Sequence, residues 1–252
     1  MTSDETLDEL RLHGLMLRQF RSGYRFSLDP LLLCSFAAGR IAGSVIDLGT
    51  GCGVIPLVLA RTAEGVQVTG VEVQQDMAEL ASRNVSLNGL AERVSIVHDD
   101  VLNLRRRFPV SSFDLVVANP PFRRPGTGKL SPRAGRDLAR HESTATLEDF
   151  LAAAKYLVKP QGSICLVHHP SRLADLICTA AGMKLSPARL RMVHGKAGDE
   201  ARIVLVEFLK GRKAGLRVLP PLLVYGEDGE YTEEAAGILG TGDRAGNGGL
   251  GE

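Results

Sequence analysis

Val45-Ile46-Asp47-Leu48-Gly49-Thr50-Gly51-Cys52-Gly53 is the stretch of this 252-residue chain that says most about its fold. An apolar run of strand length ends at Leu48, and the loop that follows has glycine at every second position. Glycine lets the backbone adopt a positive φ and lets a ligand approach it closely. The stretch therefore predicts a strand, a ligand-binding loop and a helix over 53–62, which is the opening unit of an α/β fold.

Similar apolar runs recur along the chain, with segments of helical spacing between them. Strands are expected at 45–48, 66–73, 94–98, 113–118 and 163–168, and helices at 53–62, 74–88 and 171–181. Two further strands, at 184–193 and 202–209, are joined by a polar loop and predict an antiparallel hairpin at the sheet edge. The fold class is therefore α/β, a Rossmann-like sheet of seven strands that is mostly parallel, with helices on both faces.

Composition narrows the class of protein further. Hydrophobic residues make up 44% of the chain, enough to bury a sizeable core, and the formal net charge is only +1. The acidic N-terminus lacks the pattern of a secretory signal, and the apolar runs are too short to span a membrane. The four cysteines show no CxxC spacing and no histidines stand at zinc-ligand intervals. We expect a cytoplasmic protein with neither a bound metal nor a membrane contact.

Acidic residues stand at or just beyond the carboxyl ends of three successive predicted strands and indicate the cofactor. Asp47 suits a ligand with an ammonium group, such as the methionine part of S-adenosyl-L-methionine. Glu72 lies about twenty residues beyond the glycines, where an acid accepts hydrogen bonds from ribose hydroxyls. Asp100, rather than Asp99, is expected to accept a hydrogen bond from the adenine amino group, with Val101 beside it. An NAD-dependent enzyme is the alternative, but the spacing is GxGxG rather than GxGxxG.

Asn119-Pro120-Pro121-Phe122 follows the predicted strand 113–118 and is the candidate reaction loop. The prolines fix the backbone, so that the Asn119 side-chain oxygen and the Pro120 carbonyl face one point as rigid acceptors. Such a pair holds the hydrogens of an amine or amide nitrogen and stabilises the charge that develops there during methyl transfer. Phe122 offers a stacking face for a planar target. The plain alternative is a turn that starts at Asn-Pro.

A basic segment leaves directly from the reaction loop. Residues 123–140 contain six Arg or Lys residues and a single acid, Asp137. The basic side chains are expected to hold nucleic-acid phosphates while a base is drawn out of its stack. An ordinary solvated loop is the alternative. The expected substrate-binding residues are Arg123, Arg124, Lys129, Arg133, Arg136 and Arg140.

The motifs 47–53 and 119–122 resemble those of the seven-stranded methyltransferases that modify amino nitrogens. Two more stretches, 23–33 and 123–142, are similar to the bacterial tRNA(Val) adenine-N6 methyltransferases, which modify the adenine next to the anticodon. The resemblance covers nearly the whole chain before its tail and implies a monomeric enzyme that acts on tRNA. This family often has tyrosine where the chain has Phe122, a change that keeps stacking and removes any hydroxyl contact.

The residue patterns predict four parts of the chain. We expect an N-terminal helical or lid segment at 1–44, in which Phe26 lies near the transferred methyl group, and a methyltransferase catalytic domain at 45–210. A C-terminal extension at 211–239 contains a short helix capped by Thr232. The glycine-rich tail, 240–252, is expected to be disordered. The expected cofactor-binding residues are Asp47, Gly49, Gly51, Gly53, Glu72, Asp100, Val101, Asn119 and Phe26.

Other activities remain open from the residues alone. A protein glutamine-N methyltransferase uses the same Asn-Pro-Pro chemistry on an amide, but it is expected to carry a larger helical domain before residue 45. An adenine of ribosomal RNA or DNA is another possible target. An RNA-binding module with a degenerate cofactor site is disfavoured because Asp47, Glu72 and Asn119 are all present.

Overall fold

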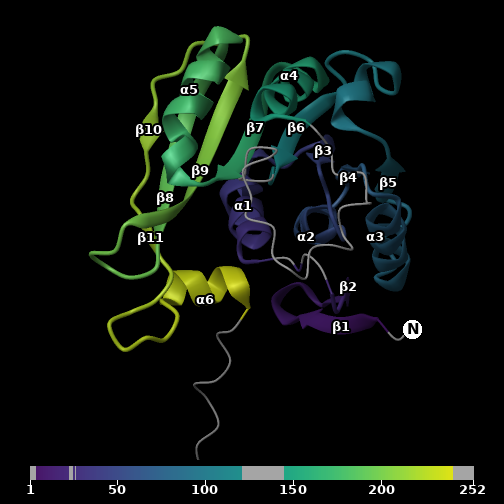
Figure 1. Cartoon of the computed structure of the whole chain (residues 1–252), viewed down its shortest axis with the longest axis horizontal. Helices are drawn as coiled ribbons and strands as arrows, with labels where there is room; N and C mark the ends of the chain where they lie inside the picture. Colours follow the sequence, from purple (N-terminus) through teal and green to yellow (C-terminus); the bar gives the residue numbers. More distant parts are fainter. Residues whose placement is uncertain (1–3, 23–24, 26, 121–144, 241–252) are drawn as a thin grey trace, which may run out of the picture.

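A computed structural model describes residues 4–22, 25, 27–120 and 145–240 of the chain. Its centre is a nine-stranded sheet with the order β10-β8-β9-β7-β6-β3-β4-β5, and β11 also pairs with β8 (Figure 1). Only β9 runs antiparallel to its neighbours, β7 and β8. The strands are β3 (Ser44–Leu48), β4 (Gln67–Glu72), β5 (Val94–His98), β6 (Phe113–Ala118), β7 (Val158–His168), β8 (Leu185–His194), β9 (Ala201–Lys210), β10 (Arg217–Val218) and β11 (Leu222–Leu223). The predicted α/β sheet with its antiparallel edge hairpin is confirmed.

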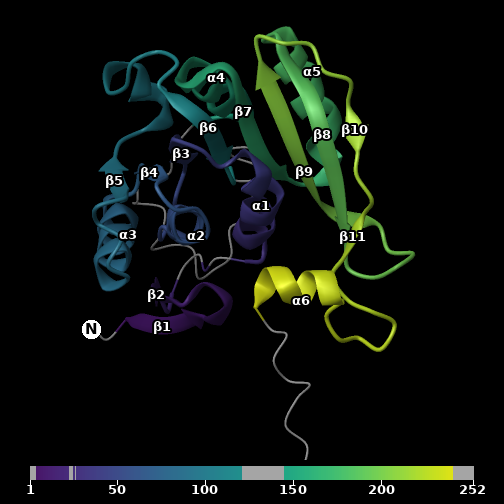
Figure 2. The same cartoon turned by 180° about the vertical axis from the view of Figure 1, so that it is seen from behind.

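Helices cover both faces of this sheet, as Figures 1 and 2 show from opposite sides. One face carries α1 (Asp29–Ala37), α2 (Val54–Thr62) and α3 (Gln75–Leu87), and the other carries α4 (Leu147–Leu157) and α5 (Leu173–Gly182). A last helix, α6 (Glu233–Leu239), lies beside α1. Short 3-10 turns complete the described chain at η1 (Arg11–His13), η2 (Ala38–Arg40), η3 (Val101–Arg106) and η5 (Pro170–Arg172).

The central strands are apolar on both sides, and each side fills a separate core. Successive side chains of a strand point to opposite faces of a sheet. Val45, Leu115 and Val117 accordingly pack with α1 and α2, whereas Ile46 and Val116 pack with α4 and α5. This double burial explains why the parallel strands read as continuous apolar runs rather than as alternating ones.

The N-terminal segment differs from the expected helical one. Residues 5–20 form an antiparallel hairpin of β1 (Glu5–Leu10) and β2 (Leu15–Phe20), and within 1–44 only α1 is an α-helix among the described residues. β2 alternates buried and half-buried side chains, with Leu15 and Leu17 in the core beneath α2 and α3. A period of two suits a strand and cannot form one apolar face of a helix. The helical expectation is therefore wrong for residues 5–20.

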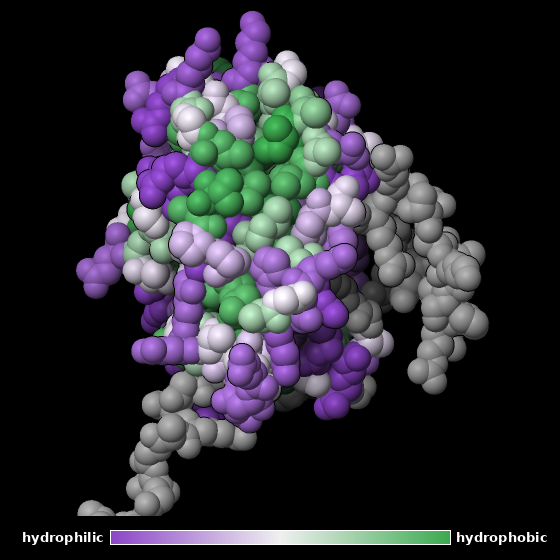
Figure 3. Space-filling view, turned by 90° about the vertical axis from the view of Figure 1, so that its left-hand side faces the viewer, coloured by the Kyte–Doolittle hydropathy of each residue, from purple (hydrophilic) through white to green (hydrophobic). Residues whose placement is uncertain are grey.

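The C-terminal extension runs along the β8 side of the sheet and pairs with it. β10 and β11 each pair in parallel with β8, and Thr232 Oγ1 accepts a hydrogen bond from the Ala235 amide, which confirms the predicted cap of α6. Apolar side chains gather on the side of the molecule where α5, β8 and β10 lie (Figure 3). Val218 of β10 is 67% exposed. The tail beyond Gly240 lies outside the described residues.

Two smaller expectations concern the chain as a whole. None of the helices in the described ranges is long and apolar enough to cross a membrane. The cysteines are free thiols, buried at Cys34, Cys52 and Cys165 and exposed at Cys178.

Candidate functional site

The register of the parallel strands brings the predicted site residues to one edge of the sheet. Leu48, the last residue of β3, pairs with Val71 of β4 and with Ala118, the last residue of β6. Glu72, which ends β4, pairs with His98 at the end of β5. Residues just beyond these ends therefore leave the sheet at the same level. The structure places the glycine loop between Glu72 on one side and Asn119 on the other, at the edge where open α/β sheets bind ligands.

The glycine loop has a conformation that requires glycine. Gly49, Gly51 and Gly53 have φ values of 79°, 57° and 87°, which lie in the left-handed region that L side chains rarely adopt. Crowding is slight at Gly49 and Gly51, where a Cβ would meet its nearest neighbour at 3.7 and 3.8 Å, but a Cβ at Gly53 would lie 3.2 Å from Ala81 Cβ. Backbone conformation thus explains all three glycines, and close packing adds to the requirement at Gly53.

Hydrogen bonds from β4 hold this loop in place. The amides of Gly49 and Thr50 both donate to the carbonyl of Val71, at 2.9 and 2.8 Å. The amide of Gly51 donates to Glu72 Oε2 at 2.8 Å. The loop is therefore preorganised by the neighbouring strand without any ligand, which lowers the conformational entropy lost when one binds.

Asp47 is the most unusual side chain of the site. Its carboxylate is 0% exposed, and neither oxygen has a hydrogen-bond partner within the described residues; the same holds for the Thr50 hydroxyl beside it. Burial raises the pKa of Asp47 to about 7, the nearby Thr50 hydroxyl opposes this rise, and the charge of Glu72 adds to it. A buried carboxylate without a partner is destabilising unless a ligand supplies one. Asp47 is thus suited to receive a cationic hydrogen-bond donor.

Glu72 accepts hydrogen bonds from the protein backbone and can accept further ones from a ligand. Besides the Gly51 amide, it binds the Gln74 amide through Oε1 at 2.9 Å. Burial raises the pKa of Glu72, and these two amides partly oppose the rise. Each carboxylate oxygen can accept more than one hydrogen bond, so both remain able to bind hydroxyl groups.

Asp99 and Asp100, the two acids after β5, have different hydrogen-bond partners. Asp99 is engaged at both oxygens, by the Asp100 amide at 2.8 Å and by Arg107 Nε at 3.3 Å. Asp100 uses Oδ1 to cap η3 through the Leu102 amide at 3.0 Å. Val101 begins η3 and is buried. This arrangement favours Asp100 over Asp99 as a ligand acceptor, in line with the sequence-based preference.

Only part of the predicted reaction loop can be placed. Asn119 is half-buried and Pro120 is buried, immediately after β6. Pro121, Phe122, Phe26 and the six basic residues from Arg123 to Arg140 lie outside the described residues. Within the described parts of the chain, no three His, Cys, Asp or Glu side chains gather in a way that could hold a metal ion.

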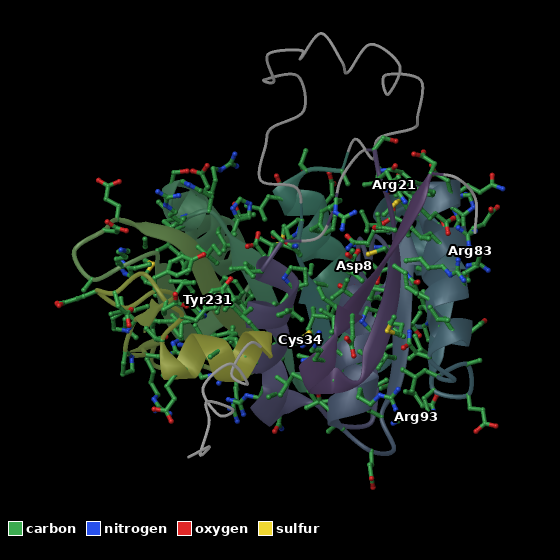
Figure 4. All side chains as sticks on the ribbon, turned by 90° about the horizontal axis from the view of Figure 1, so that it is seen from below. Asp8, Arg21, Cys34, Arg83, Arg93 and Tyr231 are labelled. Carbon is green, nitrogen blue, oxygen red and sulfur yellow. The ribbon has the colours of Figure 1, made fainter. Side chains whose placement is uncertain are left out.

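Two polar residues of α3 and its C-terminal cap were not anticipated from the sequence. Asn84 of α3 and the C-cap residue Asn88 stand four positions apart and both bind the backbone of β2. Arg83 beside them pairs with buried Glu5 at 2.7 Å, and Figure 4 shows Arg83 on α3 next to the hairpin that carries Asp8. The available signal was a pair of asparagines next to the apolar stripe that includes Ala81 and Val85.

Comparison with known proteins agrees with this geometry. The model of the methyltransferase small domain family matches residues 29–177. A tRNA1(Val) (adenine(37)-N6)-methyltransferase from Porphyromonas gingivalis is 34% identical over 190 residues, which cover 73% of this chain and 74% of the relative. A protein of the same name from Erwinia tasmaniensis is 34% identical over 231 residues, covering 88% and 91%. The crystal structure of a predicted O-methyltransferase from Agrobacterium tumefaciens is similar with a TM-score of 0.69 and 25% identity, covering 84% of this chain and 95% of that one.

Proposed function

The chain belongs to the methyltransferase small domain family and is an S-adenosylmethionine-dependent N-methyltransferase, and we propose that its substrate is tRNA(Val), methylated at N6 of adenine 37 next to the anticodon. The observation that carries this proposal is the register of the sheet edge. It brings the glycine loop, the unpartnered Asp47 and the Asn-Pro motif to neighbouring strand ends. The names of the curated relatives support the choice of tRNA(Val) among possible substrates.

The residues at this edge fit S-adenosylmethionine. Asp47 offers a buried carboxylate for the ammonium group of the methionine part, and the positive-φ glycines let the ligand lie against the backbone. Glu72 has acceptor capacity left for the ribose hydroxyls, and Asp100 stands where the adenine amino group can donate to it. When bound, the cofactor supplies an electrophilic methyl group on a positively charged sulfur.

Asn119 and Pro120 are the proposed catalytic residues, together with Pro121 and Phe122. The adenine N6 lone pair is delocalised into the ring, which makes the amino group a poor nucleophile. The Asn119 side-chain oxygen and the Pro120 carbonyl accept the two N6 hydrogens and so favour a more tetrahedral nitrogen. They also stabilise the positive charge that grows on N6 during transfer. The charge disappears when N6 releases a proton, and no strong base is required for the transfer step.

The basic segment 123–140 is the proposed tRNA-binding part of the protein. The basic residues of 123–140 hold tRNA phosphates while Phe122 stacks on the flipped adenine. The protein acts as a monomer in the cytoplasm, where mature tRNA is modified. We also propose that Phe26 contributes to cofactor binding near the transferred methyl group.

The decisive experiment incubates the full chain with radiolabelled S-adenosylmethionine and an unmodified tRNA(Val) transcript, followed by nucleoside analysis. Label is expected in N6-methyladenosine, and a matched transcript with guanine at position 37 should stay unlabelled. Label in the guanine transcript would move the target to another adenine. A release-factor peptide, a ribosomal RNA fragment and a DNA duplex run in parallel. If label enters one of these and not tRNA(Val), the proposed substrate is wrong.

A further inference from the structure

The side chain of Asn84 joins three parts of the molecule. It is 0% exposed, and its Oδ1 accepts a hydrogen bond from the Arg18 amide of β2 at 2.8 Å. Its Nδ2 donates to the Arg18 carbonyl at 3.0 Å and to the carbonyl of Cys52 at 2.9 Å. One buried amide on α3 therefore ties the N-terminal hairpin to the glycine loop.

The carbonyl of Cys52 needs this donor. The hydrogen-bond ladder of α2 begins one residue later, where the Leu57 amide donates to the carbonyl of Gly53. Cys52 thus precedes the helix, and a buried backbone carbonyl is destabilising if it is left without a partner. The amide of Gly53, on the same peptide unit, donates to the Thr50 carbonyl at 3.0 Å. Asn84 and Thr50 together fix both ends of the Cys52–Gly53 peptide unit.

Asn88 provides an internal comparison. Its Oδ1 accepts from the Met16 amide at 2.9 Å and its Nδ2 donates to the Met16 carbonyl at 2.8 Å, which is the same double contact to β2. Its second Nδ2 hydrogen bond goes to the Asn84 carbonyl within α3. Asn88 therefore docks the hairpin in the same way as Asn84 but has no bond to the glycine loop.

We propose that Asn84 is a positioning residue for the methyl donor, because it couples docking of the N-terminal hairpin to the ligand-binding conformation of the glycine loop. The inference rests on the proposed function, since it takes the loop as the cofactor site. Without the Asn84 amide, the Cys52–Gly53 peptide unit is held at one end only. Its rotation changes the direction of the neighbouring Gly51 amide, which Glu72 holds at 2.8 Å. The coupling is reciprocal, so cofactor binding stabilises the hairpin as much as the hairpin stabilises the cofactor site.

The test compares Asn84→Ala with Asn88→Ala in the full chain. S-adenosylhomocysteine affinity is measured by calorimetry, and thermal unfolding is followed by circular dichroism. Each variant loses its double contact to β2, and we expect similar falls in melting temperature. Asn84→Ala is expected to weaken ligand binding by about tenfold, the equivalent of one or two hydrogen bonds, and Asn88→Ala to stay within about twofold of the wild type.

A second readout follows the hairpin itself. In the wild type, S-adenosylhomocysteine is expected to slow hydrogen exchange at the amides of β2, and this protection should be absent in Asn84→Ala. If Asn84→Ala does not fold, Asn84→Asp replaces it, because the carboxylate still accepts from the Arg18 amide and loses only the two Nδ2 donations, to the carbonyls of Cys52 and Arg18. A purely structural role of Asn84 predicts loss of stability with unchanged ligand affinity per folded molecule.

The outcomes separate this inference from the proposed function. Equal weakening by both alanine variants, or ligand binding by Asn84→Ala within about twofold of the wild type, overturns the role of Asn84 alone. Failure of the wild type to bind S-adenosylhomocysteine overturns the cofactor site and this inference with it. Tight binding by the wild type without methylation of tRNA(Val) contradicts only the substrate.

Discussion

Thr50 of the glycine loop packs directly against the bare Cα of Gly70 in β4. A Cβ at Gly70 would lie 2.9 Å from Thr50 Oγ1, 3.0 Å from Thr50 Cγ2 and 2.9 Å from Ile96 Cδ1, closer than side chains tolerate. The identity of one strand residue therefore decides where the loop between Asp47 and α2 lies.

Gly70→Ala is accordingly expected to displace the loop and weaken S-adenosylhomocysteine binding by about tenfold, in line with the 1–3 kcal/mol typical of overpacking. The double variant Gly70→Ala/Thr50→Ala removes both clashing Thr50 atoms and should recover much of the affinity, because the clash that remains is with Ile96 Cδ1, the end of a flexible side chain outside the glycine loop. Calorimetry on the two proteins checks this. Wild-type affinity in the single variant would show that the loop has room to move.

Asn119→Ala should abolish methyl transfer without removing the cofactor. Loss of one acceptor for the developing charge is expected to lower kcat by about 100-fold or more. Affinity for S-adenosylhomocysteine should remain within a few fold, because Asp47, Glu72 and the glycine loop are unchanged. Single-turnover rates on tRNA(Val) and calorimetry on the same sample make the comparison. A parallel loss of ligand affinity would assign Asn119 to the structure of the loop instead.

Asp47 makes ligand binding depend on pH near neutrality. Because its pKa is raised from 3.8 to about 7, the folded protein without ligand holds this carboxyl protonated below that pH. S-adenosylhomocysteine affinity should rise as the pH approaches about 7 and level off above it, with release of a proton on binding. Calorimetry in two buffers of different ionisation enthalpy measures that proton. No change in the observed heat between buffers would contradict the assignment.

Asp47 also makes the folding stability depend on pH, and this stability falls with rising pH where the ligand affinity rises. A carboxyl whose pKa is higher in the folded state than in the unfolded state lowers stability as the pH rises between the two values. The melting temperature of the wild type should therefore fall, relative to Asp47→Asn, as the pH rises from 3.8 to about 7. Asp47→Asn should be the more stable protein at about pH 8 and the weaker binder. A variant less stable than the wild type at that pH would contradict an unpartnered carboxylate.

Glu207 is a buried acid that the site does not use. It is 0% exposed on β9 and pairs with Arg40 at 2.6 Å and with Arg189, and it accepts from Ser163 at 2.8 Å. Burial alone would raise the pKa of Glu207, but these partners hold it below its usual value. The cluster joins the α1–η2 region to the antiparallel edge of the sheet.

Glu207→Gln leaves two arginines without their counter-ion and should lower the free energy of unfolding by about 3 kcal/mol, as breaking a buried pair does. Glu9→Gln, which breaks an exposed pair with Arg11, should change it by less than about 0.5 kcal/mol. The Glu207 contribution is present above the ordinary pKa of 4.5 and is lost as the pH falls through the lowered folded value. Urea titrations at neutral and acidic pH test both statements. Equal losses in the two variants would contradict a buried cluster.

The sheet was predictable because its signal is local and strong. β5 and β6 begin and end where the apolar runs predicted, at 94–98 and 113–118. β1 and β2 were missed because charged residues interrupt their alternation, so that the residues 5–20 resemble an amphipathic segment of either kind. β10 and β11 have two residues each, which is too short for any periodicity.

The candidate site was predictable to the extent that strand ends define it. Asp47 and Glu72 lie at the carboxyl ends of apolar strands and Asp100 lies just beyond one, and parallel pairing brings these strand ends to the same edge. The hydrogen bond from the Gly51 amide to Glu72 and the bonds of Asn84 depend on tertiary packing, which leaves no mark in the sequence beyond the residue types. From sequence alone, an asparagine in a helix indicates only low helix propensity and does not reveal a buried side chain that bonds two other segments.

Asn84 and Asn88 also cover one edge of the N-terminal hairpin. A strand at the edge of a small sheet exposes unpaired amides and carbonyls that can recruit another chain. On β2, the Met16 and Arg18 groups that would face outward are occupied by Asn88 and Asn84. A helix thus completes the two-stranded sheet as a third strand would, and the aggregation-prone edge that remains is that of β1, which carries the charges of Asp8 and Glu9.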